Sequence, residues 1–201
     1  MIKSQKLREV VGSLLRPVAP RAPLALHATW EEQIRDLRRT IRERRYEELE
    51  PKLQAMEKWL DSEGSAHPEL IEKTNQLGDY FQELAGDNLA AERLYRKALE
   101  LAEGAPATHP GGLALSLNNL GVFELHARRH REAEELFDRL LPLAEETFGE
   151  ESLEVASCLE NLAAVYRATN RQDAATEVRS RAVRIRRKHR SNPGSSPRGS
   201  R

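Results

Sequence analysis

The chain has 201 residues, enough for one domain of ordinary size or a short array of repeats but tight for two full domains. Alanine, leucine, glutamate and arginine make up about half of it and aromatic residues 5%, a composition that favours exposed helices and excludes an all-β fold. The formal net charge of zero conceals basic ends and a segment, residues 22–178, with 18 basic and 31 acidic side chains. A single cysteine and the absence of any apolar run of roughly 18 residues lead us to expect a soluble, cytoplasmic protein.

Residues 1–24 are predicted to form a basic amphipathic helix and a proline-containing link. The helix ends before Pro17, and its apolar side chains are Ile2, Leu7, Val10, Val11, Leu14 and Leu15. Such a helix could cap the following repeats or dock on a partner, contact a membrane surface, or act as a targeting segment. These three interpretations stay open.

Residues 25–190 repeat with a period of 42 residues. The dipeptide His67-Pro68 recurs at His109-Pro110. The same interval separates Leu49, Ala91, Ala133 and Ala175. The period predicts a divergent copy at 25–66 and three clearer copies at 67–108, 109–150 and 151–190.

Each copy is predicted to form two amphipathic helices joined by a polar turn, since apolar residues recur at helical spacing on one side of each segment. A small residue recurs in the first helix, at Gly78, Gly121 and Ala163. Glycine costs a helix about 1 kcal/mol relative to alanine, so we expect close contact between the paired helices at these positions. The first clear copy has one extra residue between Gly78 and Ala91.

Residues 191–201 contain no apolar side chain and are predicted to form a disordered basic tail. Residues 179–201 as a whole hold nine basic residues and no acidic one. The tail either folds back toward Glu72, Asp79 and Glu160 or stays solvated. Binding of nucleic acid or an anionic surface through this segment is the alternative to protein binding, although no aromatic residue interleaves the arginines.

The 42-residue length, the spacing of small residues about 12 apart and several sequence strings resemble the tetratricopeptide repeat of the kinesin light chain type. The strings are Leu-Asn-Asn-Leu-Gly at 117–121, Glu-Ala-Glu-Glu-Leu-Phe at 132–137 and Glu-Asn-Leu-Ala-Ala-Val-Tyr at 160–166. The resemblance covers about residues 67–190. It implies an all-α, right-handed superhelical stack of antiparallel helix pairs, an α-solenoid.

The resemblance also implies that the first helix of each pair lines a concave groove. The residues it places there are Glu72, Asn75, Gln76 and Asp79, then Leu115, Asn118, Asn119 and Val122, then Ser157, Glu160, Asn161 and Ala164. Asparagine suits an extended peptide because its amide both donates and accepts hydrogen bonds. The alternative is that these side chains merely face solvent. Because no lysine or arginine occupies these positions, we do not expect the groove to grip a C-terminal carboxylate.

Catalytic and metal-binding patterns are weak in this sequence. His126 and His130 flank a predicted turn and lack a third ligand, and no motif ties a histidine to Cys158. No glycine-rich loop has the context of a phosphate-binding motif. We therefore expect a non-enzymatic adaptor without cofactor or metal that binds a peptide or helix of a partner protein. Self-association stays open.

Overall fold

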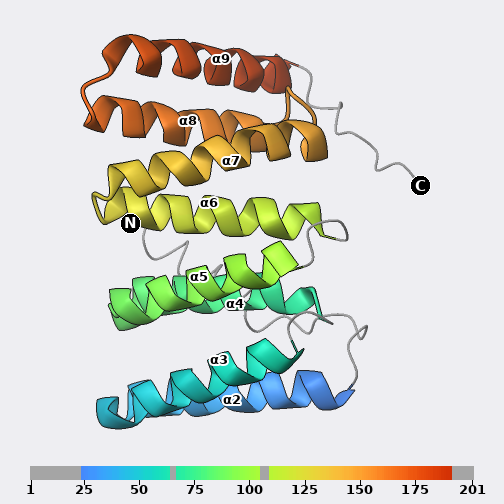
Figure 1. The fold of residues 1–201 in the computed structure, drawn as a ribbon, viewed down its shortest axis with the longest axis vertical. Coiled ribbons are helices and arrows are strands. Elements are labelled where there is room, and N and C mark those ends of the chain that lie inside the picture. The colour runs from blue at the N-terminus through green and yellow to red at the C-terminus, as the bar shows by residue number, and fades with distance from the viewer. Residues whose placement is uncertain (1–23, 64–66, 105–108, 192–201) are drawn as a thin grey trace. The chain divides into compact units, whose positions relative to one another are not determined.

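The computed structural model describes residues 24–63, 67–104 and 109–191 (Figure 1). The predictions for residues 1–23 and for tail residues 192–201 lie outside these ranges. The described ranges contain helices and turns and no strand, and neighbouring helices pack in pairs, which confirms the predicted all-α class. The chain divides into two compact units, unit 1 (Met1–Gly112) and unit 2 (Leu113–Arg201).

Unit 1 contains two helix pairs. Helix α2 (Leu24–Arg42) pairs with α3 (Leu49–Glu63) through the short η1 turn (Tyr46–Glu48), and α4 (Glu69–Tyr80) pairs with α5 (Asn88–Gly104). Pro51 stands in the first turn of α3, where its missing amide hydrogen removes no helical hydrogen bond. The largest core side chains of the unit are Trp30, Leu37, Met56, Leu60, Leu70, Ile71, Leu77, Phe81, Leu94 and Tyr95.

The extra residue of the first clear copy is absorbed in a π-helical turn, η3 (Phe81–Ala85), at the end of α4. A π turn is one residue wider than an α turn, so it accommodates an insertion without separating the paired helices. Gly86 then adopts a φ of 67°, in the left-handed region that glycine enters at little cost. Asp87 accepts a hydrogen bond from the Ala90 amide at 3.0 Å and so caps the start of α5.

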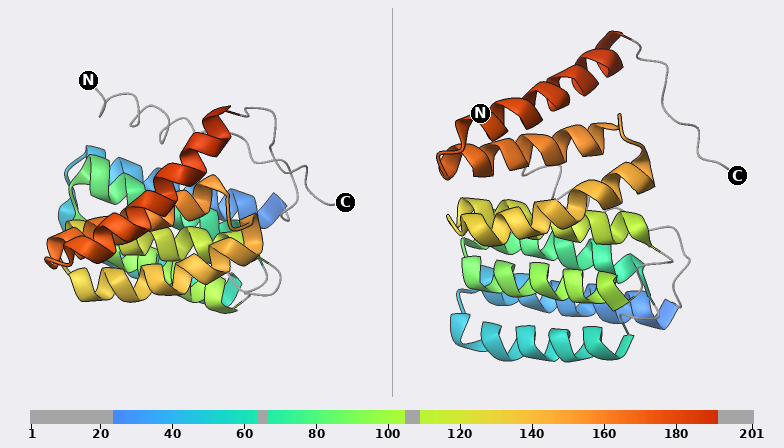
Figure 2. Two further views of the ribbon diagram at one scale, coloured as in Figure 1. Left: turned by 90° about the horizontal axis from the view of Figure 1, so that it is seen from above. Right: turned by 45° about the horizontal axis from the view of Figure 1, so that its top comes forward.

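Unit 2 contains most of α6 (Pro110–His126), together with α7 (His130–Phe148), α8 (Leu153–Ala168) and α9 (Gln172–Ser191). Helix α9 lies against α8, and α8 also packs on α7 (Figure 2). Ser152 starts α8, because its Oγ accepts a hydrogen bond from the Val155 amide at 3.2 Å. The core of the unit includes Leu117, Leu120, Phe123, Phe137, Leu140, Val155, Leu159, Leu162, Val165 and Ile185.

Within two helix pairs, the second helix packs tightly on the glycine of the first helix that the sequence singled out. A methyl group built on Gly78 would lie 2.7 Å from Cε1 of Tyr95, and one built on Gly121 would lie 2.7 Å from Cε1 of Phe137. Carbon atoms in ordinary contact lie about 3.5–4.0 Å apart, so neither position has room for a side chain. The predicted helix contacts at Gly78 and Gly121 are confirmed.

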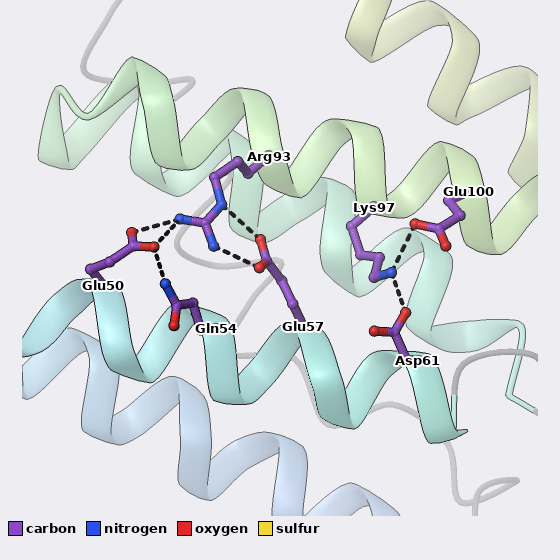
Figure 3. Close-up of polar contacts among 7 residues, drawn as sticks. All are labelled: Glu50, Gln54, Glu57, Asp61, Arg93, Lys97 and Glu100. Carbon is purple, nitrogen blue, oxygen red and sulfur yellow. Dashed lines mark hydrogen bonds and ion pairs between the residues drawn. The ribbon is translucent and has the colours of Figure 1, made fainter.

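Ion pairs join the second helices of the two pairs in unit 1 (Figure 3). The Arg93 guanidinium of α5 donates to both carboxylate oxygens of Glu57, at 2.9 and 2.6 Å, and to those of Glu50, at 2.7 and 2.6 Å. Hydrogen bonding to Glu57 raises the pKa of Arg93. One turn further along α5, Lys97 pairs with Asp61 of α3.

Unit 2 has the counterpart of the Lys97–Asp61 pair. Arg181 of α9 pairs with Glu145 of α7 at 2.6 Å. Both residues stand two 42-residue periods after their counterparts in unit 1. The period of the sequence therefore recurs as a period of contacts between second helices.

Candidate functional site

A pocket of about 280 Å³ opens between α6, α7 and α8 of unit 2. Its lining residues are Ala114, Leu115, Asn118, Leu140, Ala144, Phe148, Leu153, Glu154 and Ser157. The pocket is slightly smaller than typical small-molecule sites, which occupy roughly 300–1,000 Å³. Its mostly apolar lining and its size suit one large side chain of a peptide.

Two helix faces supply the polar side of the pocket. Leu115 and Asn118 lie one turn apart on α6, while Glu154, Ser157 and Asn161 follow one another on a single face of α8. The pocket thus brings together three residues that were predicted from the sequence to line the groove. They are Leu115 and Asn118 of α6 and Ser157 of α8. Asn161 lies beside the pocket through its contact with Asn118.

The asparagines of α6 and α8 form a short ladder. Asn161 Nδ2 donates to Asn118 Oδ1 at 3.2 Å, and Asn118 Nδ2 donates to Asn119 Oδ1 at 3.4 Å. All three side chains are half-buried, which leaves them accessible to a ligand. Asn161 Oδ1 remains able to accept a hydrogen bond. Val122 and Ala164, the last predicted groove residues of these helices, are also half-buried but do not line the pocket.

Pro142 lies inside α7, between Leu140 and Ala144, which both line the pocket. Proline has no amide hydrogen to donate to the carbonyl four residues earlier, and its ring pushes that carbonyl away. The helix nevertheless continues to Phe148. The pocket therefore lies beside the segment of α7 whose backbone hydrogen bonding is weakest.

Arg186 of α9 reaches the same face of α8, and the sequence did not indicate this. Its Nε and Nη2 atoms donate to the two oxygens of Glu160 at 2.6 and 2.7 Å, and Nη2 also donates to Ser157 Oγ at 3.1 Å. Hydrogen bonding to Glu160 raises the pKa of Arg186. The groove positions were assigned on first helices only, so a residue of a second helix was missed. The only available signal was the concentration of basic residues near the end of the chain.

In unit 1, all four predicted groove residues have hydrogen-bond partners within the unit. Asn75 is 1% exposed, and its Nδ2 donates to a carbonyl of its own helix at 3.0 Å. Asp79 accepts a hydrogen bond from the Tyr95 hydroxyl at 2.7 Å. Glu72 is exposed and Gln76 half-buried, and Gln76 Nε2 donates to Glu72 at 3.0 Å. Asn75 is therefore not accessible to a ligand in this structure.

The described residues show little that could support catalysis. Burial raises the pKa of the Cys158 thiol to about 12, so the thiol stays protonated and weakly nucleophilic at neutral pH. In the described ranges, no three histidine, cysteine, aspartate or glutamate side chains are placed to hold a metal ion. Likewise, none of the described helices combines the length and apolar character needed to span a membrane.

Comparisons with known proteins agree with this geometry. Residues 112–188 match the model of the tetratricopeptide repeat family. A crystal structure of a putative kinesin light chain with nearly identical tetratricopeptide-like repeats from Podosopora anserina is similar, with a TM-score of 0.58, 18% identity, and coverage of 96% of this chain and 87% of that one. BtubC (BKLC) from P. vanneervenii matches with a TM-score of 0.40, 18% identity, and coverage of 85% and 95%.

No curated protein matches the sequence. The family match covers α7, α8 and most of α6 and α9, and it therefore includes the residues of α6, α7 and α8 that build the pocket and the asparagine ladder. The structural match extends over almost the whole chain. Residues 112–188 therefore match the tetratricopeptide repeat family, and the helix pairs of the chain have a fold similar to that of kinesin light chain-like repeats.

Proposed function

We propose that the protein is a non-enzymatic adaptor that binds a peptide or helix of a partner protein at the pocket of unit 2. Tetratricopeptide repeats generally mediate protein–protein interactions. The observation that carries the proposal is the hydrogen bond between Asn118 and Asn161, which places two amides beside a largely apolar pocket. A single cysteine in the sequence is compatible with action in the cytoplasm.

The two parts of the site would bind different parts of a peptide. An apolar side chain would enter the pocket among Leu115, Leu140 and Phe148, and its full burial contributes about 1.5–3 kcal/mol. The amides of Asn118 and Asn161 would hydrogen-bond to the peptide backbone, each bond contributing about 0.5–1.5 kcal/mol. Ordering the peptide opposes these gains, so we expect a weak affinity for a short peptide.

The site extends beyond the pocket in this proposal. In unit 2, Asn119 and Val122 continue the same face of α6. Considered by itself, unit 1 offers a partner Glu72 and Gln76 among its groove residues, since Asn75 is buried and Asp79 is bonded to Tyr95.

A peptide array tests the proposal. The intact chain is applied to immobilised random-sequence peptides beside a variant with Asn118, Asn119 and Asn161 replaced by alanine. A second variant with alanine at Glu132 and Glu135, both exposed on α7, is the matched control. We expect the wild type and the control to bind the same peptides and the asparagine variant to lose most of them, with helicity by circular dichroism unchanged in all three. A folded asparagine variant that binds the wild-type set with equal strength would refute the proposal.

A further inference from the structure

The segment from the last turn of α7 to the first turn of α8 is densely acidic. It carries Glu145 and Glu146 at the end of α7, Glu150 and Glu151 between the helices, and Glu154 at the start of α8. Phe148 and Leu153, which come from the same segment, line the pocket. The mouth of the pocket is therefore built partly from a segment of high negative charge.

Two of these five carboxylates are neutralised by α9. Glu145 pairs with Arg181 at 2.6 Å, and Glu151 pairs with Lys188. The side chains of Glu146, Glu150 and Glu154 form no ion pair with any residue in the described ranges. Of these three, Glu154 lines the pocket, and it therefore brings to the pocket a negative charge that no ion pair within the described ranges compensates.

Glu154 is the decisive member because it lines the pocket itself. It lies one helical turn before Ser157 and next to Leu153, which is 42% exposed. Arg186, which donates to Ser157 on this face of α8, already gives two hydrogen bonds to Glu160. The charged residue in the lining of the pocket is therefore a carboxylate that has no ion-pair partner in the part of the chain that the structure describes.

We infer that the pocket selects extended peptides in which a large apolar side chain stands within two residues of a lysine or arginine. This inference rests on the proposed function and adds the charge of the ligand to it. The apolar side chain would fill the space beside Leu140 and Phe148, and the cation would pair with Glu154. An acidic peptide would meet the repulsion of Glu154 and could reach Arg186 only by breaking its bidentate pair with Glu160.

Three synthetic peptides test the inference against the full-length chain. Each is a heptapeptide with blocked termini and a central leucine. The two residues next to the leucine are both lysine, both glutamine or both glutamate, and the four outer residues are glycine and serine. Each peptide, without a label, is titrated into the protein while NMR monitors binding, because NMR detects dissociation constants up to the millimolar range. We expect the lysine peptide to bind about 2- to 5-fold more tightly than the glutamine peptide and the glutamate peptide more weakly than both. Raising the salt concentration should reduce these differences because it screens exposed charges.

The variant Glu154→Gln isolates the residue responsible. It should bind the lysine and glutamine peptides with affinities within a factor of about 1.5 of each other. Glu132→Gln, at the far end of α7, is the control and should keep the wild-type preference. Binding without charge preference in the wild type, or a preference that survives Glu154→Gln, would overturn the inference and leave the proposed function standing. If none of the three peptides binds the wild type, both proposals fail.

Discussion

Unit 1 and unit 2 place different aromatic side chains against equivalent glycines of their first helices. In unit 1 the ring of Tyr95 covers Gly78, and its hydroxyl donates to Asp79 at 2.7 Å and to Gln82 at 3.1 Å. In unit 2 the ring of Phe137 covers Gly121. Burial raises the pKa of Tyr95, and the negative charge of Asp79 adds to this effect, so the hydroxyl remains a donor.

The neighbouring positions differ in step with this substitution. Asp79 follows Gly78 directly, and the residue that follows Gly121 is Val122. A tyrosine on the second helix thus coincides with a carboxylate on the first, and a phenylalanine coincides with a valine. The residue type at a groove position can therefore depend on the side chain it contacts inside the helix pair as much as on a ligand.

The asparagines show the same contrast. Asn75 of unit 1 is 1% exposed and bonds to its own helix, whereas its counterpart Asn118 in unit 2 is half-buried and bonds across to Asn161 of the next first helix. The same residue type at equivalent repeat positions therefore has a structural use in one unit and an accessible position in the other. This difference is why the proposed function centres on unit 2.

The largest expected effect comes from filling the two glycine contacts. Gly78→Leu and Gly121→Leu should each lower the free energy of unfolding by about 1–3 kcal/mol, because the new side chain meets an aromatic ring that has no room to move away. Glu135→Leu, on the exposed face of α7, is the control and should change it by less than about 0.5 kcal/mol. Chemical denaturation measures all three. Equal, small changes would show that the glycines are not the contact points of the pairs.

Replacing the aromatic residue of one unit by that of the other tests whether each glycine contact depends on its own neighbouring side chains. Phe137→Tyr should cost about 1–3 kcal/mol because Val122, unlike Asp79, cannot accept a hydrogen bond from the new hydroxyl. Adding Val122→Asp to this variant should recover part of the loss, and a double-mutant cycle from denaturation data measures the coupling. A coupling near zero would mean that the tyrosine–aspartate pair cannot be transferred between units.

The reverse change, Tyr95→Phe, should have a smaller effect. It removes one hydrogen bond to Asp79, which contributes about 0.5–1.5 kcal/mol net. Denaturation of Tyr95→Phe and Phe137→Tyr compares two losses in the free energy of unfolding. The first comes from removing a hydrogen bond, and the second comes from burying a hydroxyl group that has no acceptor. A Tyr95→Phe variant as stable as wild type would indicate that the bond stabilises unit 1 very little.

The surface ion pairs should matter least. In unit 2, hydrogen bonding to Arg171 lowers the pKa of Glu134 from its ordinary value of 4.5. The folded state therefore favours the ionised carboxylate, so the contribution of the pair is present above pH 4.5 and is lost as the pH falls through the lowered pKa. Thermal melts of wild type and Arg171→Met should differ slightly at pH 7, and the difference should shrink as the pH is lowered below 4.5. A difference that does not shrink would assign the effect to packing of Arg171 on Tyr166.

The periodic features of the fold were predictable because they depend on helix periodicity and on small residues at fixed intervals. Gly78 and Gly121 mark helix contacts in the sequence and in the structure. The extra residue after Gly78 was visible as well, but its accommodation in a π turn was not, since an insertion can equally lengthen a loop.

The candidate site was predictable only in part. Leu115, Asn118 and Ser157 were assigned to one surface and do line one pocket. Glu154 and Arg186 were missed, because their roles depend on which side chains meet across helices and no periodic pattern encodes that. The structural use of Asp79 could have been inferred from Tyr95, which replaces phenylalanine at the equivalent position of the second copy.

Unit 2, and not unit 1, is proposed to present accessible asparagine amides to a peptide. NMR of the side-chain amides in the intact chain, during titration with the lysine-flanked leucine peptide, measures this accessibility at each residue. We expect saturable shifts of the Asn118 and Asn161 resonances with one shared dissociation constant, while the Asn75 resonance stays in place because that side chain is buried. Unmoved Asn118 and Asn161 resonances at millimolar peptide, or an equal shift of Asn75, would contradict it.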